Sequence, residues 1–244
     1  MGRLLGSGRS PGRHAGVLLG LALLAGGAGV WAAATSAPLG PAAGEREAQR
    51  LVARLRATYR RVVDYRVRVV TERRRDSRIP EITEVVYRFR RPGRIRIDFL
   101  RPRRGLRLVF PDGRGRVGVR PGGWLGFLRL SLDPGNPLVR AGPGQRVDQT
   151  HLGLLVEKIA ESVGPGRTGP LAVERAGAAA ILRVEARHHF LPGERARYEF
   201  WIDTARWLPS KVHEALLSRR EEREIRFLDW EINPGLSDEV FQLD

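Results

Sequence analysis

Between residues 65 and 119, apolar side chains alternate with charged ones at a period of two, and arginine supplies most of the charge. In residues 65–71, for example, the run YRVRVVT alternates in this way. A period of two places successive side chains on opposite faces of a strand. Turn residues at 92–93 and 111–113 separate the runs. This pattern predicts antiparallel strands with one apolar face and one arginine-rich face.

Two helices and a second group of strands complete the predicted elements. Residues 45–63 begin with acids and continue with apolar residues at helical spacing. A second helix is predicted to end at about Val163, with Asp148 or Thr150 as its N-cap. A one-sided sheet must cover its apolar face, so we expect the helices to pack there. The later strands are predicted at residues 171–175, 180–187, 195–202, 211–217 and 222–231.

Residues 121–143 follow neither period. This stretch contains Trp124, Leu125, Phe127 and Leu128 among many glycines and prolines. It is too rich in glycine and proline for a long helix, and too apolar for an ordinary solvent loop. Two interpretations remain open: a lid over an apolar cavity, or a flap packed permanently on the core.

The N-terminal segment predicts export. Residues 1–14 contain three arginines and no acid, and residues 15–34 are free of charge. A basic stretch, an apolar stretch and small residues at its end are typical of a signal peptide, here cut before Thr35. The alternative is an uncleaved anchor, because this apolar stretch is just long enough to cross a bilayer of roughly 30 Å. The predicted organisation is therefore signal peptide or anchor (1–34), linker (35–44) and exported domain (45–244).

The formal net charge is +16, from 43 Lys and Arg against 27 Asp and Glu. Such a charge is typical of nucleic-acid binding, but only Lys158 and Lys211 are lysines, so the arginine excess also fits a codon bias. Because the chain is predicted to be exported, we expect no nucleic acid as partner. The sequence has no cysteine, which excludes disulfides, thiolate metal sites and a lipid anchor on cysteine.

The sequence offers few candidates for catalysis. It contains no HExxH, and none of Ser131, Ser162 and Ser210 lies in a G-x-S-x-G elbow. His188 and His189 are adjacent, so on a strand they would point to opposite faces and could not line one site together. We therefore expect no enzyme, no metal and no cofactor.

The C-terminal half carries a family resemblance. Residues 200–212, FWIDTARWLPSKV, and residues 227–233, FLDWEIN, followed by Gly235-Leu236 and a late Phe241, resemble the LolA/LolB-like superfamily. That superfamily includes the periplasmic lipoprotein carrier and the N-terminal domain of MucB/RseB-type sensors. The resemblance spans residues 45–244. It implies an α+β fold, in which a single antiparallel sheet of about 10–11 strands curves into an unclosed half-barrel with helices and a lid-like segment on its concave side.

The resemblance also implies a function. We expect a periplasmic, monomeric carrier that binds lipid or lipoprotein acyl chains in an apolar cavity, for outer-membrane lipoprotein sorting or envelope lipid trafficking. An inner-membrane or outer-membrane protein and an anionic membrane surface are the further expected partners. The alternative is a non-enzymatic envelope sensor or assembly module that binds a protein partner. The residues predicted to line the cavity or its lid are Tyr87, Phe89, Ile97, Phe99, Phe110, Trp124, Leu125, Phe127, Leu128, Leu155, Ile159 and Trp201.

Overall fold

The structure, a computed structural model, describes residues 41–76, 78–141 and 144–243. These residues belong to one compact unit, Ser36–Asp244. The predicted signal or anchor segment (1–34) lies outside the described residues. Within the described residues, no helix is both long enough and apolar enough to span a bilayer.

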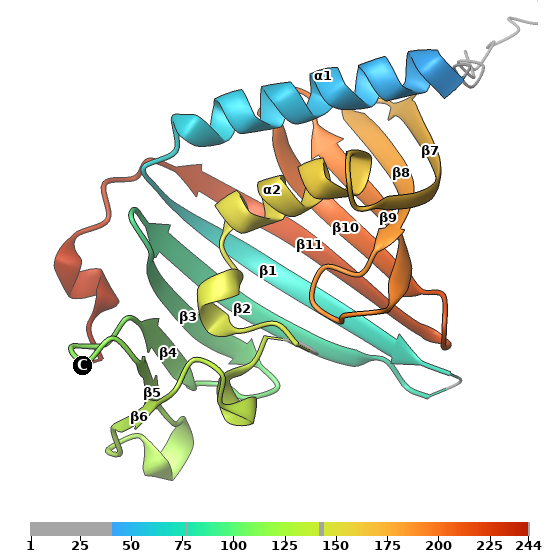
Figure 1. Ribbon diagram of the computed structural model, residues 1–244. Coiled ribbons are helices and arrows are strands. Elements are labelled where there is room, and N and C mark those ends of the chain that lie inside the picture. The colour runs from blue at the N-terminus through green and yellow to red at the C-terminus, as the bar shows by residue number, and fades with distance from the viewer. Residues whose placement is uncertain (1–40, 77, 142–143, 244) are drawn as a thin grey trace, which may run out of the picture. The chain divides into compact units, whose positions relative to one another are not determined.

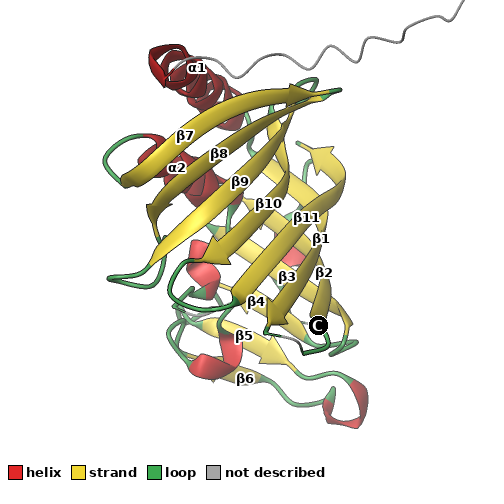
Figure 2. Ribbon diagram, turned by 90° about the vertical axis from the view of Figure 1, so that its right-hand side faces the viewer, coloured by secondary structure: helices red, strands yellow, loops and turns green. Residues whose placement is uncertain are grey.

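One antiparallel sheet of eleven strands forms the body of the molecule (Figures 1 and 2). Its order is β6-β5-β4-β3-β2-β1-β11-β10-β9-β8-β7, so the first and last strands pair in the middle and the sheet does not close. This confirms the predicted α+β fold with an open, continuous sheet. The strands are β1 (Asp64–Arg75), β2 (Glu81–Arg90), β3 (Arg94–Arg101), β4 (Arg107–Phe110), β5 (Val117–Arg120), β6 (Leu130–Leu132), β7 (Arg167–Ala176), β8 (Ala179–Arg187), β9 (Arg195–Asp203), β10 (Leu208–Leu216) and β11 (Glu221–Ile232).

Helices α1 (Pro41–Arg60) and α2 (Leu152–Val163) both lie on the same side of the sheet (Figure 2). Helix α1 starts four residues earlier than predicted, so residues 41–44 are helical and not part of a linker. Helix α2 starts later than predicted. Its N-cap is His151, whose Nδ1 accepts a hydrogen bond from Leu154 N at 3.2 Å. The predicted caps were wrong, because the chain around them forms a separate 3-10 turn, η3 (Val147–Gln149).

Two tyrosines of the sheet hold the start of α2. Tyr65 Oη accepts a hydrogen bond from Leu152 N at 2.9 Å, and Tyr87 Oη lies 3.0 Å from Thr150 Oγ1. Both tyrosines are buried. These bonds satisfy a free amide at the helix N-terminus, and they fix the height of α2 above the sheet. The space beneath α2 is therefore set by side chains of β1 and β2.

Side-chain hydrogen bonds tie the residues that follow β11 to the start of β1. Asn233 adopts a φ of 54°, and its Oδ1 accepts from Val63 N at 2.7 Å. Asp64, which is buried, accepts from Leu236 N at 2.8 Å. The motif residues behind the family resemblance therefore have structural roles here. Asp203, another motif residue, closes a turn, because its Oδ1 accepts hydrogen bonds from the amides of Ala205 and Arg206.

The arginine-rich face of the sheet is a lattice of cross-strand ion pairs. Arg68 pairs with both Glu84 (3.0 Å) and Asp229 (2.7 Å). Asp98 forms an ion pair with Arg96, whose Nε lies 2.9 Å from its carboxylate, and it also pairs with arginines of β2 and β4. Exposed pairs of this kind contribute little stability each, about 0–1 kcal/mol. Much of the positive charge is thus balanced locally.

Candidate functional site

A cavity of about 840 Å³ lies between the sheet and the segment that leads into α2. One wall consists of side chains from the central strands. The other consists of residues from the 3-10 turn η2 (Pro137–Val139), from η3 and from the first turns of α2. Figure 1 shows η3, the yellow turn below α2, lying in front of the sheet near β2. This volume is in the usual range for ligand pockets, roughly 300–1,000 Å³.

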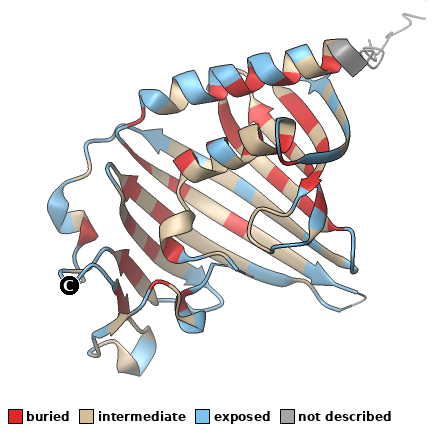
Figure 3. Cartoon of the chain, in the orientation of Figure 1, coloured by how far each residue is buried: buried red, intermediate tan, exposed pale blue. Residues whose placement is uncertain are grey.

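The middle of the cavity is apolar. Phe99, Val85, Val69 and Phe227 stand side by side on four neighbouring strands, because they are direct partners in the strand register. All four line the cavity and are only partly buried. In Figure 3 the corresponding stretch of β1 is largely of intermediate burial. Apolar side chains that protein atoms leave partly uncovered are a surface that an apolar ligand can cover. The remaining apolar lining includes Val67, Leu106, Leu108, Leu138, Val139, Val212, Ile225 and Trp230.

One end of the cavity is polar. Glu81, Arg73, Arg223, Glu214 and Tyr198 are successive partners across β2, β1, β11, β10 and β9, and all five line the cavity. We call these five residues the polar row. It lies towards the β1–β2 and β10–β11 connections, whereas the apolar residues continue towards α1. The cavity therefore has an apolar stretch that ends at a row of charged groups.

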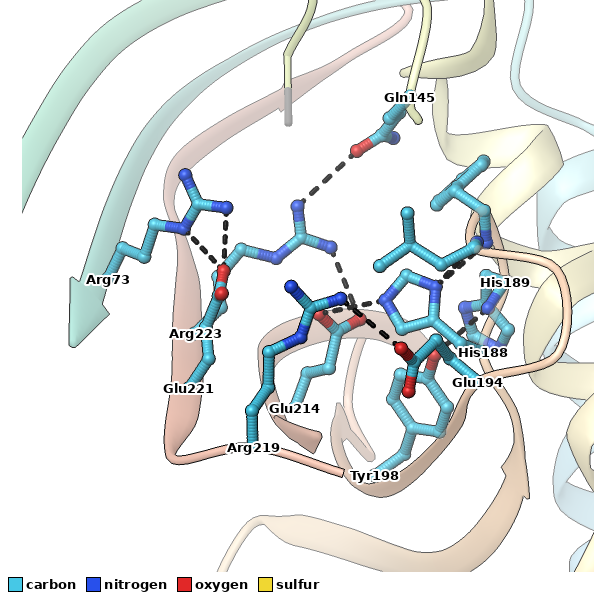
Figure 4. Close-up of polar contacts among 12 residues, drawn as sticks. Arg73, Gln145, His188, His189, Glu194, Tyr198, Glu214, Arg219, Glu221 and Arg223 are labelled. Carbon is cyan, nitrogen blue, oxygen red and sulfur yellow. Dashed lines mark hydrogen bonds and ion pairs between the residues drawn. The ribbon is translucent and has the colours of Figure 1, made fainter. Parts of the chain in front are cut away.

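Glu214 and Arg223 form the centre of the polar row (Figure 4). Arg223 Nη2 lies 3.3 Å from Glu214 Oε2, and the two side chains are only 13% and 9% exposed. Burial opposes ionisation of Glu214, but Arg223 and the hydrogen bond from His188 outweigh it and lower the pKa of Glu214 to about 2. The carboxylate is charged at neutral pH. Arg223 Nε is buried without a hydrogen-bond partner among the described residues, so one donor of the cavity wall is unused.

The two adjacent histidines meet in one cluster, contrary to the prediction. His188 Nδ1 accepts hydrogen bonds from the backbone amides of Phe190 and Leu191. Its Nε2 lies 3.4 Å from Glu214 Oε1. The ring of His189 stacks on Tyr198 with centroids 4.2 Å apart. The prediction failed because β8 ends at Arg187, so strand alternation does not apply to the loop that follows.

The His189 imidazole makes stability depend on pH. Its Nε2 lies 2.8 Å from Ser162 Oγ, and burial lowers its pKa to about 3. A group whose pKa is depressed from about 6.5 stabilises the folded state above that value and loses this contribution as the pH falls. We expect the free energy of unfolding to drop by about 2 kcal/mol through this group between pH 7 and 5. Urea unfolding at both pH values measures the drop.

The variant His189→Gln should lack this part of the pH dependence. Above pH 7 the two proteins should show the same slope, because His189 is then neutral in both the folded and the unfolded state. Equal slopes between pH 7 and 5 would show that His189 takes up its proton as readily in the folded as in the unfolded state.

Four of the residues predicted for the site line the cavity: Tyr87, Ile97, Phe99 and Leu155. Four others lie elsewhere in the sheet or under the helices. Phe89 and Ile159 are fully buried in the core between sheet and helices. Phe110 pairs with Ile95 and packs against the core at β4. Trp201 lies on the opposite face from its buried neighbour Phe200, with Lys211 Nζ 3.3 Å from its ring centroid.

The predicted lid is not over the cavity. None of Trp124, Leu125, Phe127 and Leu128 lines it, and Trp124 is 83% exposed. The first half of this segment instead leads to β6, which pairs with β5 as the edge strand of the sheet. Only its second half, around η2, reaches the cavity. The cover is formed by η2, η3 and the start of α2.

The sequence analysis did not assign several residues that line the cavity, although the strand alternation indicated which face they share. Arg73 continues the alternation of Tyr65, Val67, Val69 and Thr71, so its side chain must share their face. Arg223 and Phe227 continue the alternation of β11 in the same way. What no local pattern could supply was that these two strands, 150 residues apart, are neighbours.

The fold and cavity define an open antiparallel half-barrel with a ligand-sized apolar site beneath a helix. No protein-family model and no curated protein sequence matches the chain. Among solved structures, the chain is similar to a DUF1329 family protein from Desulfovibrio piger, at 12% identity and a TM-score of 0.46, over 82% of this chain and 97% of that chain.

A LolA superfamily protein from Nitrosomonas europaea is also similar, at 12% identity and a TM-score of 0.37, over 80% of this chain and 97% of that chain. A third is the Pseudomonas aeruginosa MucA/MucB complex, at 18% identity and a TM-score of 0.42 over 80% of this chain. The chain spans only 60% of that third chain. The function proposed next rests on the cavity itself.

Proposed function

We propose that this protein binds the acyl chain of a lipid or lipoprotein in its cavity and carries it through the cell envelope. The observation that supports this most directly is the cavity of about 840 Å³, whose middle is walled by partly uncovered apolar side chains. Each methylene group moved from water into such a wall contributes about 0.8 kcal/mol. Burial of the apolar surface of several methylene groups is therefore enough to hold an acyl chain, and no catalytic residue is needed.

The polar row gives the ligand an orientation. An amphiphile has one charged or hydrogen-bonding end, and the polar row offers it charged groups at one end of the cavity. Arg223 lines the cavity, and its guanidinium is a cation that an anionic headgroup oxygen can meet. The acyl chain would then extend from Arg223 past Val69 and Val85 towards α1. Transport in the periplasm, with a donor or acceptor protein in the inner or outer membrane, follows from the predicted export of the chain.

Lipid carried by the purified protein tests this function. The full chain is expressed in a bacterial envelope, purified without detergent and extracted with organic solvent, and the extract is analysed by mass spectrometry. We expect about one acyl-bearing molecule per protein, and we expect the delipidated protein to bind a fluorescent fatty acid saturably. Competition by an unlabelled fatty acid is the control.

If the protein carries no lipid and does not bind the fluorescent fatty acid, the carrier function is wrong. Isolation of a stable complex with an envelope protein, by crosslinking in cells, would then favour the sensor or assembly module.

A further inference from the structure

The edge of the sheet formed by β4, β5, β6 and their loops has a composition unlike the rest of the molecule. We call residues 101–132 the arginine lobe. It contains eight arginines and one acid, Asp112. In Figures 1 and 2 these strands lie at the lower end of the molecule, away from α1. Eight arginines less one acid give the lobe seven of the chain's sixteen net positive charges.

Several arginines of the lobe are free to meet a partner. Arg104, Arg114 and Arg116 are exposed, and none of them forms an ion pair with the described residues. Many arginines elsewhere on the sheet are paired, as Arg68 is with Glu84 and Asp229. Cationic side chains that outnumber the local acids create a positive potential that attracts anionic surfaces.

The same lobe exposes large apolar side chains. Trp124 is 83% exposed, Phe127 71% and Leu130 43%. Trp124 lies in the short 3-10 turn η1 (Gly123–Leu125), and the turn is fastened by Arg120 Nε donating to Gly126 O at 2.8 Å. Tryptophan and phenylalanine exposed together in a held turn gain no packing from their own chain. Exposed clusters of this kind mark interaction sites.

We propose that the arginine lobe docks on the surface of a bilayer that contains anionic phospholipids. Arginines near such a surface are each attracted by it, and tryptophan prefers the headgroup level, where its ring is half in apolar surroundings. The lobe offers both kinds of group, with Arg114 and Arg116 in the turn before β5 and Trp124 in the turn after it. Leu130, an aliphatic side chain beside them, fits the acyl boundary of a bilayer, whereas a nucleic-acid surface stacks its bases on aromatic rings.

The lobe also borders the cavity. Pro102, Arg103 and Leu106 belong to the lobe and line the cavity wall. A docked lobe would therefore hold the cavity wall close to the membrane, which is the geometry that loading or release of a lipid needs. Docking goes beyond the proposed acyl binding and does not depend on it, because none of the exposed side chains in η1 and its neighbours reaches the cavity.

Vesicle co-sedimentation of the full chain tests the docking. One set of vesicles is phosphatidylcholine alone, and the other contains equal parts of phosphatidylcholine and phosphatidylglycerol. We expect binding to the anionic vesicles at low salt and its loss at high salt, because screening weakens the attraction. The variant Arg104→Gln/Arg114→Gln/Arg116→Gln should lower the partition coefficient about a hundredfold, and Trp124→Ala/Phe127→Ala at least tenfold.

Matched variants serve as controls. Arg78→Gln/Arg187→Gln/Arg220→Gln removes the same charge from exposed arginines elsewhere, and Ile79→Ala removes an apolar side chain that is 91% exposed. Both should bind vesicles with the affinity of the original chain to within about threefold. The N-terminal segment is the same in every variant, so it does not affect these comparisons.

The outcomes separate docking from its rivals. Equal binding to both kinds of vesicle at both salt concentrations, or undiminished binding by the lobe variants, would overturn the proposal. So would lobe variants that lose affinity for a single-stranded oligonucleotide but not for vesicles. Fatty-acid binding by Trp124→Ala/Phe127→Ala should be unchanged. A protein that docks but binds no fatty acid would refute the carrier function and leave the docking intact.

Discussion

Replacing Val85 with tryptophan should lower the affinity for a fluorescent fatty acid by roughly fiftyfold. Val85 stands between Val69 and Phe99 in the apolar middle of the cavity and is only partly buried. The larger indole would occupy space that the acyl chain needs. Loss of about three methylene contacts at about 0.8 kcal/mol each corresponds to this change in affinity. A fluorescence titration of the delipidated protein measures it.

Val86→Trp is the matched control. Val86 is the next residue of β2, so its side chain lies on the opposite face, away from the cavity. It should bind the fatty acid like the original chain. Thermal unfolding of both variants confirms that each is folded. If Val85→Trp were folded and kept full affinity, the acyl chain would not lie in this cavity.

Replacing Arg223 with methionine should lower the free energy of unfolding by about 3–5 kcal/mol. The substitution leaves the Glu214 carboxylate buried without its cation, and such a broken buried pair costs this much. For a domain of this size the midpoint of thermal unfolding should fall by about 10 °C. Arg226→Met is the control. Arg226 is exposed and pairs with Glu224 at 3.4 Å, so its loss should cost less than about 1 kcal/mol.

A second substitution and a change of pH identify the cause. Arg223→Met/Glu214→Gln should recover most of the loss, because a neutral amide oxygen can still accept the hydrogen bond from His188. In the original chain Glu214 stabilises the fold above about pH 4.3 and loses this contribution as the pH falls towards 2. The deficit of Arg223→Met should therefore shrink at pH 4. A deficit that is independent of both Glu214 and pH would indicate lost packing instead.

The two sets of variants probe different parts of one cavity. Val85→Trp acts on the apolar stretch and should change binding with little effect on stability. Arg223→Met acts on the polar row, where the same contacts contribute to folding and present a donor to the ligand. The variant also lacks any hydrogen bond from Arg223 to the headgroup of the ligand. Fatty-acid affinity and stability should therefore fall together in Arg223→Met.

Local patterns predicted much of the fold. The alternation in β1 placed Tyr65, Val67 and Val69 on one face, and the break between the strands predicted at 195–202 and 211–217 contains the turn between β9 and β10. Patterns failed where the chain leaves regular structure. Trp124 and Phe127 were assigned to a lid because they are apolar, yet pairing of β6 with β5 turns their loop to solvent. Apolar character alone does not say which surface covers a side chain.

The period of two along each strand is a property of the backbone, so the sequence alone determines which side chains share a face. Which strands become neighbours depends on contacts between distant segments, and no local period encodes it. Only the pairing of β1 with β11 placed Arg73 beside Arg223, and only the tyrosine contacts to α2 set the space above Val69 and Val85. The candidate cavity and its polar row are therefore products of tertiary structure. The sequence determined only which side chains share a face of each strand.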